Sequence, residues 1–236
     1  MKKIYIICMC LILITVSNLS FAEKNEPDEH DYIFELLDRE DGLSNLSVSH
    51  IIQDKFGFMW FSTQGGLNYY NGREMKVFRT TAFDETGLVH NLIQTMYYDE
   101  DMHELWIGTY QGISHYIIES NIFENFTVEN NNLSNPVVTS IVKDSENNIW
   151  VGTLDGLNKL EKDSKIFKQI EIPEKAVRSL LIDSNNQLLL GTHNGLYSYN
   201  KNMEKLNKVP IDLPSPYVMV VKEFEKGLLT LGWWSC

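Results

Sequence analysis

Apolar and polar residues alternate along this chain in short runs that indicate β-strands separated by turns. The clearest run, Ile149-Trp150-Val151-Gly152-Thr153, is apolar, β-branched and aromatic, which is typical of a strand. Residues 144–148 before it are turn formers, whose side chains hydrogen-bond their own backbone. Asp155-Gly156 after it predicts a hairpin, because glycine tolerates the positive φ that such turns need. Residues 157–160 then return as the next strand.

The same unit occurs four times in the sequence. Each copy has a large apolar residue at the strand centre, a threonine three residues later and a glycine six residues later. The centres are Trp60, Trp106, Trp150 and Leu189. The glycines are Gly66, Gly112, Gly156 and Gly195. The centres lie 46, 44 and 39 residues apart, and we interpret both sets of residues as structural core and turn positions.

A repeat of about 40–45 residues with several short strands predicts an all-β fold, a β-propeller with four-stranded blades. One such sheet cannot bury both of its faces, so blades must stack around an axis with the central Trp between neighbours. The repeats cover approximately residues 43–79, 91–126, 136–170, 176–207 and 217–236. The prediction is therefore an incomplete propeller of about four blades plus part of a fifth, within residues 32–236.

The first 31 residues have a different composition. Lys2 and Lys3 precede an apolar run, and small residues, Ser20 and Ala22, occupy the two positions that a signal peptidase recognises. These features predict a secretory signal peptide at residues 1–22. Residues 23–31 are polar and acidic and are expected to form a flexible leader. Export to a bacterial periplasm is the localisation that this segment predicts.

The two ends of the repeat region raise a question of closure. Residues 32–37 form an apolar strand pattern outside any repeat, and we expect this strand to latch the last blade. A fifth repeat starts near Tyr217, but the sequence stops at Cys236. We expect either a truncated reading frame, with the remainder of a receptor as partner, or a short propeller that closes against a homodimer mate.

Charge and cysteine content limit the function classes. The chain has 32 acidic and 20 basic residues, and without Lys2 and Lys3 its formal charge is −14. This acidity argues against nucleic acid as a partner. Cys8 and Cys10 lie in the apolar run, which leaves only Cys236 after cleavage, so no internal disulfide is expected.

Several motifs resemble the two-component regulator propeller family. They are Asp41-Gly42-Leu43-Ser44, the stretch from Gly57 through Trp60 to Gly72, Leu105-Trp106-Ile107-Gly108-Thr109, and Ile149-Trp150-Val151-Gly152-Thr153. The resemblance covers approximately residues 31–234. It implies the extracytoplasmic sensor region of a hybrid histidine kinase or related receptor, whose full-length relatives are anchored in the inner membrane. Leu189 departs from the family's usual Trp, so a looser blade interface is expected there.

No catalytic arrangement is evident in the sequence. The six histidines lack metal-ligand spacing, and there is no Gly-rich phosphate loop or nucleophile elbow. The acids Asp99, Glu100 and Asp101 fall in a predicted turn and are expected to be solvated. We therefore predict no metal, no cofactor and no enzymatic activity, and the kinase or cyclase modules of the family are absent from this sequence.

The turns between second and third strands are the candidate ligand positions, because their side chains vary while the flanking residues stay constant. The candidates are Gln64, Tyr110, Asp155 and His193. Tyr110 could stack on a sugar ring, and the other three could hydrogen-bond hydroxyls. The alternative is that these turn residues are merely exposed.

Three function hypotheses follow. The first is a sensory propeller module of a two-component-type receptor that reads a small solute or carbohydrate. The second is a protein-interaction scaffold without a small ligand. The third is a propeller enzyme such as a polysaccharide lyase, which the scarcity of arginine disfavours because an anionic polysaccharide needs cationic partners.

Overall fold

The computed structural model describes residues 35–80, 86–173, 175–200 and 205–232. The chain divides into two units, residues 1–36 and 37–236, and every described strand belongs to the second. The predicted signal peptide and leader lie outside the described residues. Of the predicted latch strand at residues 32–37, only 35–37 are described, and for these three residues the prediction is wrong because they are not in a strand.

The described residues of the second unit form five antiparallel sheets, the blades, of which four have four strands and the last has two. Blade 1 comprises β1 (Val48–Gln53), β2 (Met59–Thr63), β3 (Gly66–Tyr70) and β4 (Met75–Phe78). Blade 2 comprises β5 (Ile93–Asp99), β6 (Glu104–Thr109), β7 (Gly112–Ile117) and β8 (Ile122–Phe126). Blade 3 comprises β9 (Val138–Lys143), β10 (Ile149–Thr153), β11 (Gly156–Leu160) and β12 (Lys168–Ile170). Blade 4 comprises β13 (Val177–Ile182), β14 (Leu188–Thr192), β15 (Gly195–Asn200) and β16 (Lys205–Lys208). Blade 5 comprises β17 (Val220–Glu225) and β18 (Leu228–Gly232).

Within each blade, consecutive strands pair with one another as a meander. The all-β prediction of four-stranded repeats with part of a fifth is confirmed. The one helix among the described residues, α2 (Val128–Asn131), is a single turn between blades 2 and 3. The Thr127 side chain caps its start, and Asn132 ends it in the left-handed conformation.

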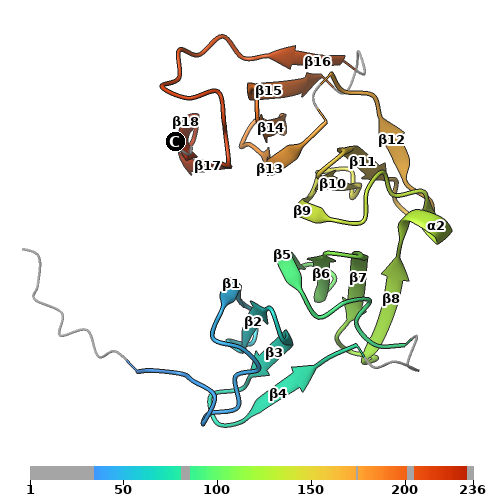
Figure 1. Cartoon of the computed structure of the whole chain (residues 1–236), viewed down its shortest axis with the longest axis vertical. Coiled ribbons are helices and arrows are strands. Elements are labelled where there is room, and N and C mark those ends of the chain that lie inside the picture. The colour runs from blue at the N-terminus through green and yellow to red at the C-terminus, as the bar shows by residue number, and fades with distance from the viewer. Residues whose placement is uncertain (1–34, 81–85, 174, 201–204, 233–236) are drawn as a thin grey trace, which may run out of the picture. The chain divides into compact units, whose positions relative to one another are not determined.

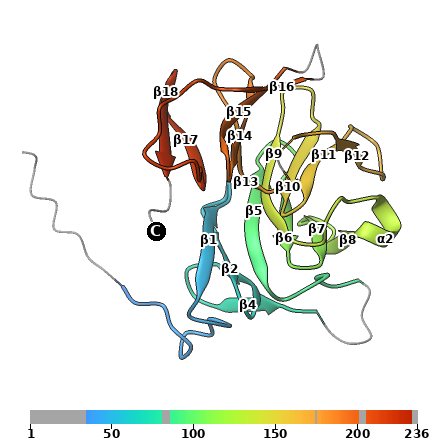
Figure 2. The ribbon, with the colours of Figure 1, turned by 45° about the horizontal axis from the view of Figure 1, so that its top comes forward.

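The blades follow one another in chain order, and the first strand of each lies innermost (Figures 1 and 2). Neighbouring first strands are in contact, β1 with β5, β5 with β9, β9 with β13 and β13 with β17. Small hydroxyl side chains connect several of them: Ser49 Oγ donates to the Ile93 carbonyl at 2.9 Å, and Ser179 Oγ accepts the Val221 N–H at 3.1 Å. These hydrogen bonds fix the spacing of adjacent blades near the axis.

The hydrophobic core lies between the blades. Each cluster combines the second and third strands of one blade with the first strand of the next, as when Trp150 and Leu157 pack with Val177 and Leu180. Trp60, Trp150 and Leu189 are each at most 3% exposed. Leu189 belongs to the cluster between blades 4 and 5, together with Leu196, Val218 and Val221. Each repeat of the sequence thus contributes one buried interface between neighbouring blades.

The repeated Thr and Gly form one turn device. Thr63 Oγ1 donates to the Gly66 carbonyl at 2.9 Å and accepts the Gly65 N–H, and the other three blades repeat this geometry. Gly66 has a φ of +121°, and a Cβ there would lie 2.4 Å from the Phe78 carbonyl oxygen. Only glycine fits this position, since the positive φ and the close backbone approach both exclude a side chain.

In blades 1 and 3, an Asp six residues before the Trp connects the first turn of the blade to that Trp. Asp54 Oδ1 accepts the backbone N–H groups of Phe56 and Phe58, and Oδ2 accepts the Trp60 indole N–H at 3.0 Å. Asp144 does the same for Trp150 at 2.8 Å. A buried indole N–H requires such a partner, so turn and core are specified together.

Candidate functional site

Three cavities are found among the described residues. The first, of about 420 Å³, lies between blades 1 and 2, and the second and largest of the three, of about 520 Å³, lies between blades 2 and 3. Both lie at the end of the blades where the first strand turns into the second. The third, of about 410 Å³, lies at the opposite end of blade 3, and it is lined by that blade and by the chain segments before and after it.

The four candidate residues predicted from the sequence occupy equivalent turns in four separate blades. Gln64 is exposed, and Tyr110 is 43% exposed. Asp155 lines the third cavity, and its Oδ1 lies 3.6 Å from Lys175 Nζ. These three positions are open to solvent, as a ligand-presenting turn would be.

His193 has the most elaborate surroundings of the four. The Arg178 Nε–H donates to His193 Nε2 at 2.7 Å, and the Tyr217 ring lies edge-on at 5.3 Å between centroids. The structure therefore brings His193 together with an arginine from the first strand of its own blade and a tyrosine from the chain leading into blade 5. None of the four predicted residues lines the largest cavity.

The largest cavity, between blades 2 and 3, is built on a row of side chains across three strands. In the register of blade 2, Trp106 on β6 pairs with His115 on β7, which pairs with Glu124 on β8. Glu104 lies two residues before Trp106 and so points to the same face. The Trp106 and His115 rings are stacked, with centroids 4.0 Å apart and an interplanar angle of 12°.

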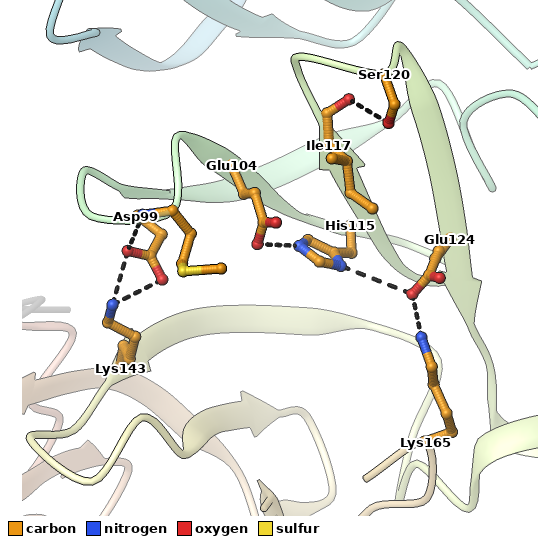
Figure 3. A network of polar contacts seen from close by, with 9 residues as sticks. Asp99, Glu104, His115, Ile117, Ser120, Glu124, Lys143 and Lys165 are labelled. Atoms are coloured by element: carbon orange, nitrogen blue, oxygen red, sulfur yellow. Dashed lines mark hydrogen bonds and ion pairs between the residues drawn. The ribbon is translucent and has the colours of Figure 1, made fainter. Parts of the chain in front are cut away.

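His115 lies between two carboxylates (Figure 3). Its Nε2 is 2.8 Å from Glu104 Oε2, and its Nδ1 is 3.9 Å from Glu124 Oε2. The side chains of His115 and Glu104 are 11% and 16% exposed. The imidazole thus shares a hydrogen bond with the Glu104 carboxylate on one side and lies close to the Glu124 carboxylate on the other, in a mostly buried position.

Lysines from blade 3 reach the carboxylates of blade 2. Lys165 Nζ contacts Glu124 Oε2, and the hydrogen bond and charge of Lys165 lower the pKa of Glu124. Lys143 Nζ lies 2.6 and 2.7 Å from the two oxygens of Asp99, whose side chain is only 5% exposed. Burial works to lower the pKa of Lys143, but its hydrogen bonds and charge interaction with Asp99 raise it above the ordinary value. Both pairs cross the blade interface (Figure 3).

The prediction that Asp99, Glu100 and Asp101 are all solvated is wrong for Asp99. Asp99 ends β5 and is 4% exposed, because Lys143 on the next blade compensates the charge. Asp101 matches the prediction, with a side chain that is 87% exposed. The sequence could not reveal this pair, since its members are 44 residues apart.

The corresponding cavity between blades 1 and 2 has a different lining. Phe58, Tyr69 and Lys76 stand where blade 2 has Glu104, His115 and Glu124. Phe58 and Tyr69 meet edge-on at 5.4 Å, and Phe78 and Tyr116 close the wall. Burial raises the pKa of Tyr116 to about 12. Aligning the repeats at these three positions would have shown that blade 2 replaces aromatic residues by Glu104 and His115, and would have identified both as candidates from the sequence.

Two negative observations apply to the described part of the chain. No group of three or more His, Cys, Asp or Glu side chains there is arranged to hold a metal ion. No helix there has the length and apolar character needed to cross a membrane.

Comparison with solved structures defines the class of the protein as a β-propeller. The extracellular domain of a putative hybrid two component system from B. thetaiotaomicron superposes with a TM-score of 0.63 at 22% identity, covering 86% of this chain and 34% of that one. Streptogramin B lyase superposes at 0.60 with 14% identity, covering 76% and 60%. The WD40 propeller domain of Doa1 gives 0.60 at 14%, covering 79% and 60%. At these identities the likeness shows the fold alone.

The family comes from the repeats themselves. Residues 42–65 and 132–155 match the family described as two component regulator propeller. A 78-residue stretch is 33% identical to Histidine kinase P4 of Formosa agariphila, covering 33% of this chain and 5% of that protein. Two of the repeats thus match this family, and the resemblance found in the sequence is confirmed. The chain spans about a twentieth of the curated relative and about a third of the B. thetaiotaomicron domain.

Proposed function

We propose that this chain is an exported sensory module of a two-component-type receptor, which binds a small solute and has no catalytic output of its own. The observation that carries the proposal is the pair of two component regulator repeats in a propeller whose fold matches the extracellular domain of a hybrid two component system. The likeness to a lyase supports the fold only, so it does not favour an enzyme.

The β2–β3-type turns are the proposed place for a carbohydrate or similar solute. Tyr110 is exposed enough to stack on a sugar ring, and Gln64 and Asp155 present hydrogen-bonding groups in the equivalent turns. A thermal-shift screen of mono- and disaccharides on the purified protein tests this site. A hit should be lost in Tyr110→Ala and retained in Glu74→Gln, an exposed change on blade 1. If no sugar raises the Tm, or if Tyr110→Ala keeps the full shift, the proposal for this face fails.

Export is tested separately by fusing alkaline phosphatase after residue 232. Activity in the periplasm is expected with residues 1–22 present and should disappear when they are deleted. Equal activity in both fusions would contradict the proposed localisation.

A second candidate function, docking of a protein partner, is favoured by the face of blade 1 that no other described blade covers. Ile51 is 58% exposed, whereas its counterparts Met96, Ile141 and Leu180 are 4–6% exposed under the preceding blade. The face therefore suits a blade of the same kind, from the remainder of a receptor or from a homodimer mate. Light scattering after size-exclusion chromatography should show a dimer that Ile51→Asp dissociates, if the mate is a second copy. A monomer at all concentrations would exclude that mate.

A further inference from the structure

The cavity between blades 2 and 3 differs in charge from its counterpart between blades 1 and 2. The latter is lined by one acid and one lysine, Asp54 and Lys76, together with aromatic rings. The former is lined by five acids and three lysines, so it carries two more negative than positive charges. At the same structural position, an aromatic lining has been replaced by an anionic one.

Two acids and one lysine lie deep in this cavity. The side chains of Asp99 and Glu104 are 5% and 16% exposed, and Lys143 is already hydrogen-bonded to both oxygens of Asp99. Lys165 is held at Glu124, and its side chain is 65% exposed at the rim. The carboxylate of Glu104 faces no lysine among the described residues, and its hydrogen-bond partner there is His115 through one of its two oxygens.

We propose that this cavity binds a small organic amine, with the ammonium group placed at Glu104 and the carbon skeleton against the wall formed by Trp106, Phe126 and Leu160. The volume of about 520 Å³ falls in the range of small-molecule sites. It is far larger than a bare metal ion requires, and the described residues offer no metal-binding group. The free oxygen of Glu104 supplies a charged acceptor in a mostly buried setting, where such a hydrogen bond is strong.

His115 positions Glu104 for this role. Its ring is stacked on Trp106, and its Nδ1 lies 3.9 Å from Glu124 Oε2, so the Glu104 carboxylate is oriented before a ligand arrives. Glu124 adds a second negative charge at the far side of the imidazole. This site is inferred from the geometry of the cavity. The sensory role proposed above would be the biological purpose of amine binding there.

Isothermal titration calorimetry on the purified protein, with matched amine and neutral probes, tests the proposal. The probes are putrescine against 1,4-butanediol and glucosamine against glucose, so each pair differs in its amino groups. At least one amine should bind saturably and at least about tenfold more tightly than its neutral analogue, because a hydrogen bond to a charged group contributes that much. The two arms also distinguish a linear amine from an amino sugar.

Variants then locate the binding. Glu104→Gln should weaken the amine about tenfold or more, since the shape is retained and the charge is removed. Glu74→Gln removes the same charge from an exposed position on blade 1 and should change affinity by less than about twofold. Unchanged near-UV circular dichroism would show that both variants fold.

Three results would overturn the proposal. They are absence of amine binding, equal affinity of wild type and Glu104→Gln, and tighter binding of glucose than of glucosamine. Because the export fusion and the sugar screen at Tyr110 do not involve this cavity, a failure here would leave the proposed sensory function standing. A failure of those experiments would in turn leave this site standing.

Discussion

Between blades 1 and 2 the cavity wall contains Phe58 and Tyr69, whereas between blades 2 and 3 the corresponding residues are Glu104 and His115. The backbone frame is the same in both, since Tyr69 and His115 each pair with the blade's Trp, and Phe58 and Glu104 each lie two residues before it. The first interface is held by ring contacts among Trp60, Phe78, Tyr116 and Phe123. The second is held by ion pairs that cross from one blade to the next.

This difference separates stability from specificity within one repeat. The Trp, Thr and Gly that build the blade are common to the first three copies, whereas the Asp binds the Trp indole in copies 1 and 3 and pairs with Lys143 in copy 2. The positions beside the Trp are free to change chemistry, because the blade does not depend on them for its turns. Aromatic residues there mainly fill space, whereas charged residues there create a polar cavity whose groups must all be satisfied.

The largest expected effect comes from the ion pair between Asp99 and Lys143. Lys143→Met should lower the free energy of unfolding by about 3–5 kcal/mol, because it leaves the buried Asp99 carboxylate without its cation. Urea denaturation followed by tryptophan fluorescence measures this. The double variant with Asp99→Leu should recover most of the loss, since both charges are then gone. A double variant less stable than the single one would contradict this account.

A second prediction compares two matched aliphatic residues on the first strands of blades 1 and 3. Ile141→Ala should cost about 2–4 kcal/mol in unfolding free energy, because Ile141 is 4% exposed between blades. Ile51→Ala should cost less than about 0.5 kcal/mol, because its counterpart position on blade 1 is mostly exposed. Parallel urea titrations of the two variants give both values. Equal losses would mean that another surface covers Ile51 in solution.

The blades could be predicted from the sequence because their signals are local. The Thr–Gly turn device joins residues three apart, and Asp54 and Trp60 are six apart, so each copy carries its own pattern within a few residues. Four repetitions then made the pattern unmistakable, and the fold class followed from the period. Strand ends are less predictable, as with β12, which begins at Lys168 although the apolar residues Ile166 and Phe167 come directly before it.

The cavity could not be predicted in the same way, because it combines residues from two blades. Lys143 and Asp99 are 44 residues apart, and Lys165 and Glu124 are 41 apart. No pattern within one copy indicates which charges will meet across the interface. The exposed turns were predictable as exposed, since they vary among copies, but their exposure does not determine what Gln64 or Tyr110 binds.

The next prediction converts one interface toward the other. Replacing both Glu104→Phe and His115→Tyr gives blade 2 the residues of blade 1, which pack edge-on. The double variant should stay within about 1 kcal/mol of the wild type, and it should lose amine binding. His115→Phe alone should cost about 1–3 kcal/mol, because Glu104 then lacks its hydrogen-bond partner in a mostly buried place. Glu104→Phe and His115→Tyr should also be measured separately by urea denaturation. If their two losses add up to the loss in the double variant, the residues do not act as a unit.

The smallest effect concerns acid stability and the pair of Glu124 and Lys165. The hydrogen bond and charge of Lys165 lower the folded-state pKa of Glu124. The pair therefore stabilises the fold at pH values above 4.5, the ordinary pKa of a glutamate. That contribution is lost as the pH falls through the lowered folded-state pKa, because the carboxylate then takes up a proton. The Glu124 side chain is 37% exposed and screened by solvent, so the contribution should be below about 1 kcal/mol.

Unfolding free energies measured at pH 7 and at pH 3 in the wild type and in Glu124→Gln test this prediction. The difference between the two proteins should be present at pH 7 and should shrink toward pH 3, as the wild-type carboxyl begins to take up a proton. Lys76 occupies the position of Glu124 in blade 1, and it lies over the Phe78 ring at 4.4 Å. Lys76→Met should therefore show no such change between pH 3 and pH 7, because a lysine keeps its charge throughout that range. An equal pH effect in both variants would assign the acid sensitivity to the whole fold rather than to the charged interface.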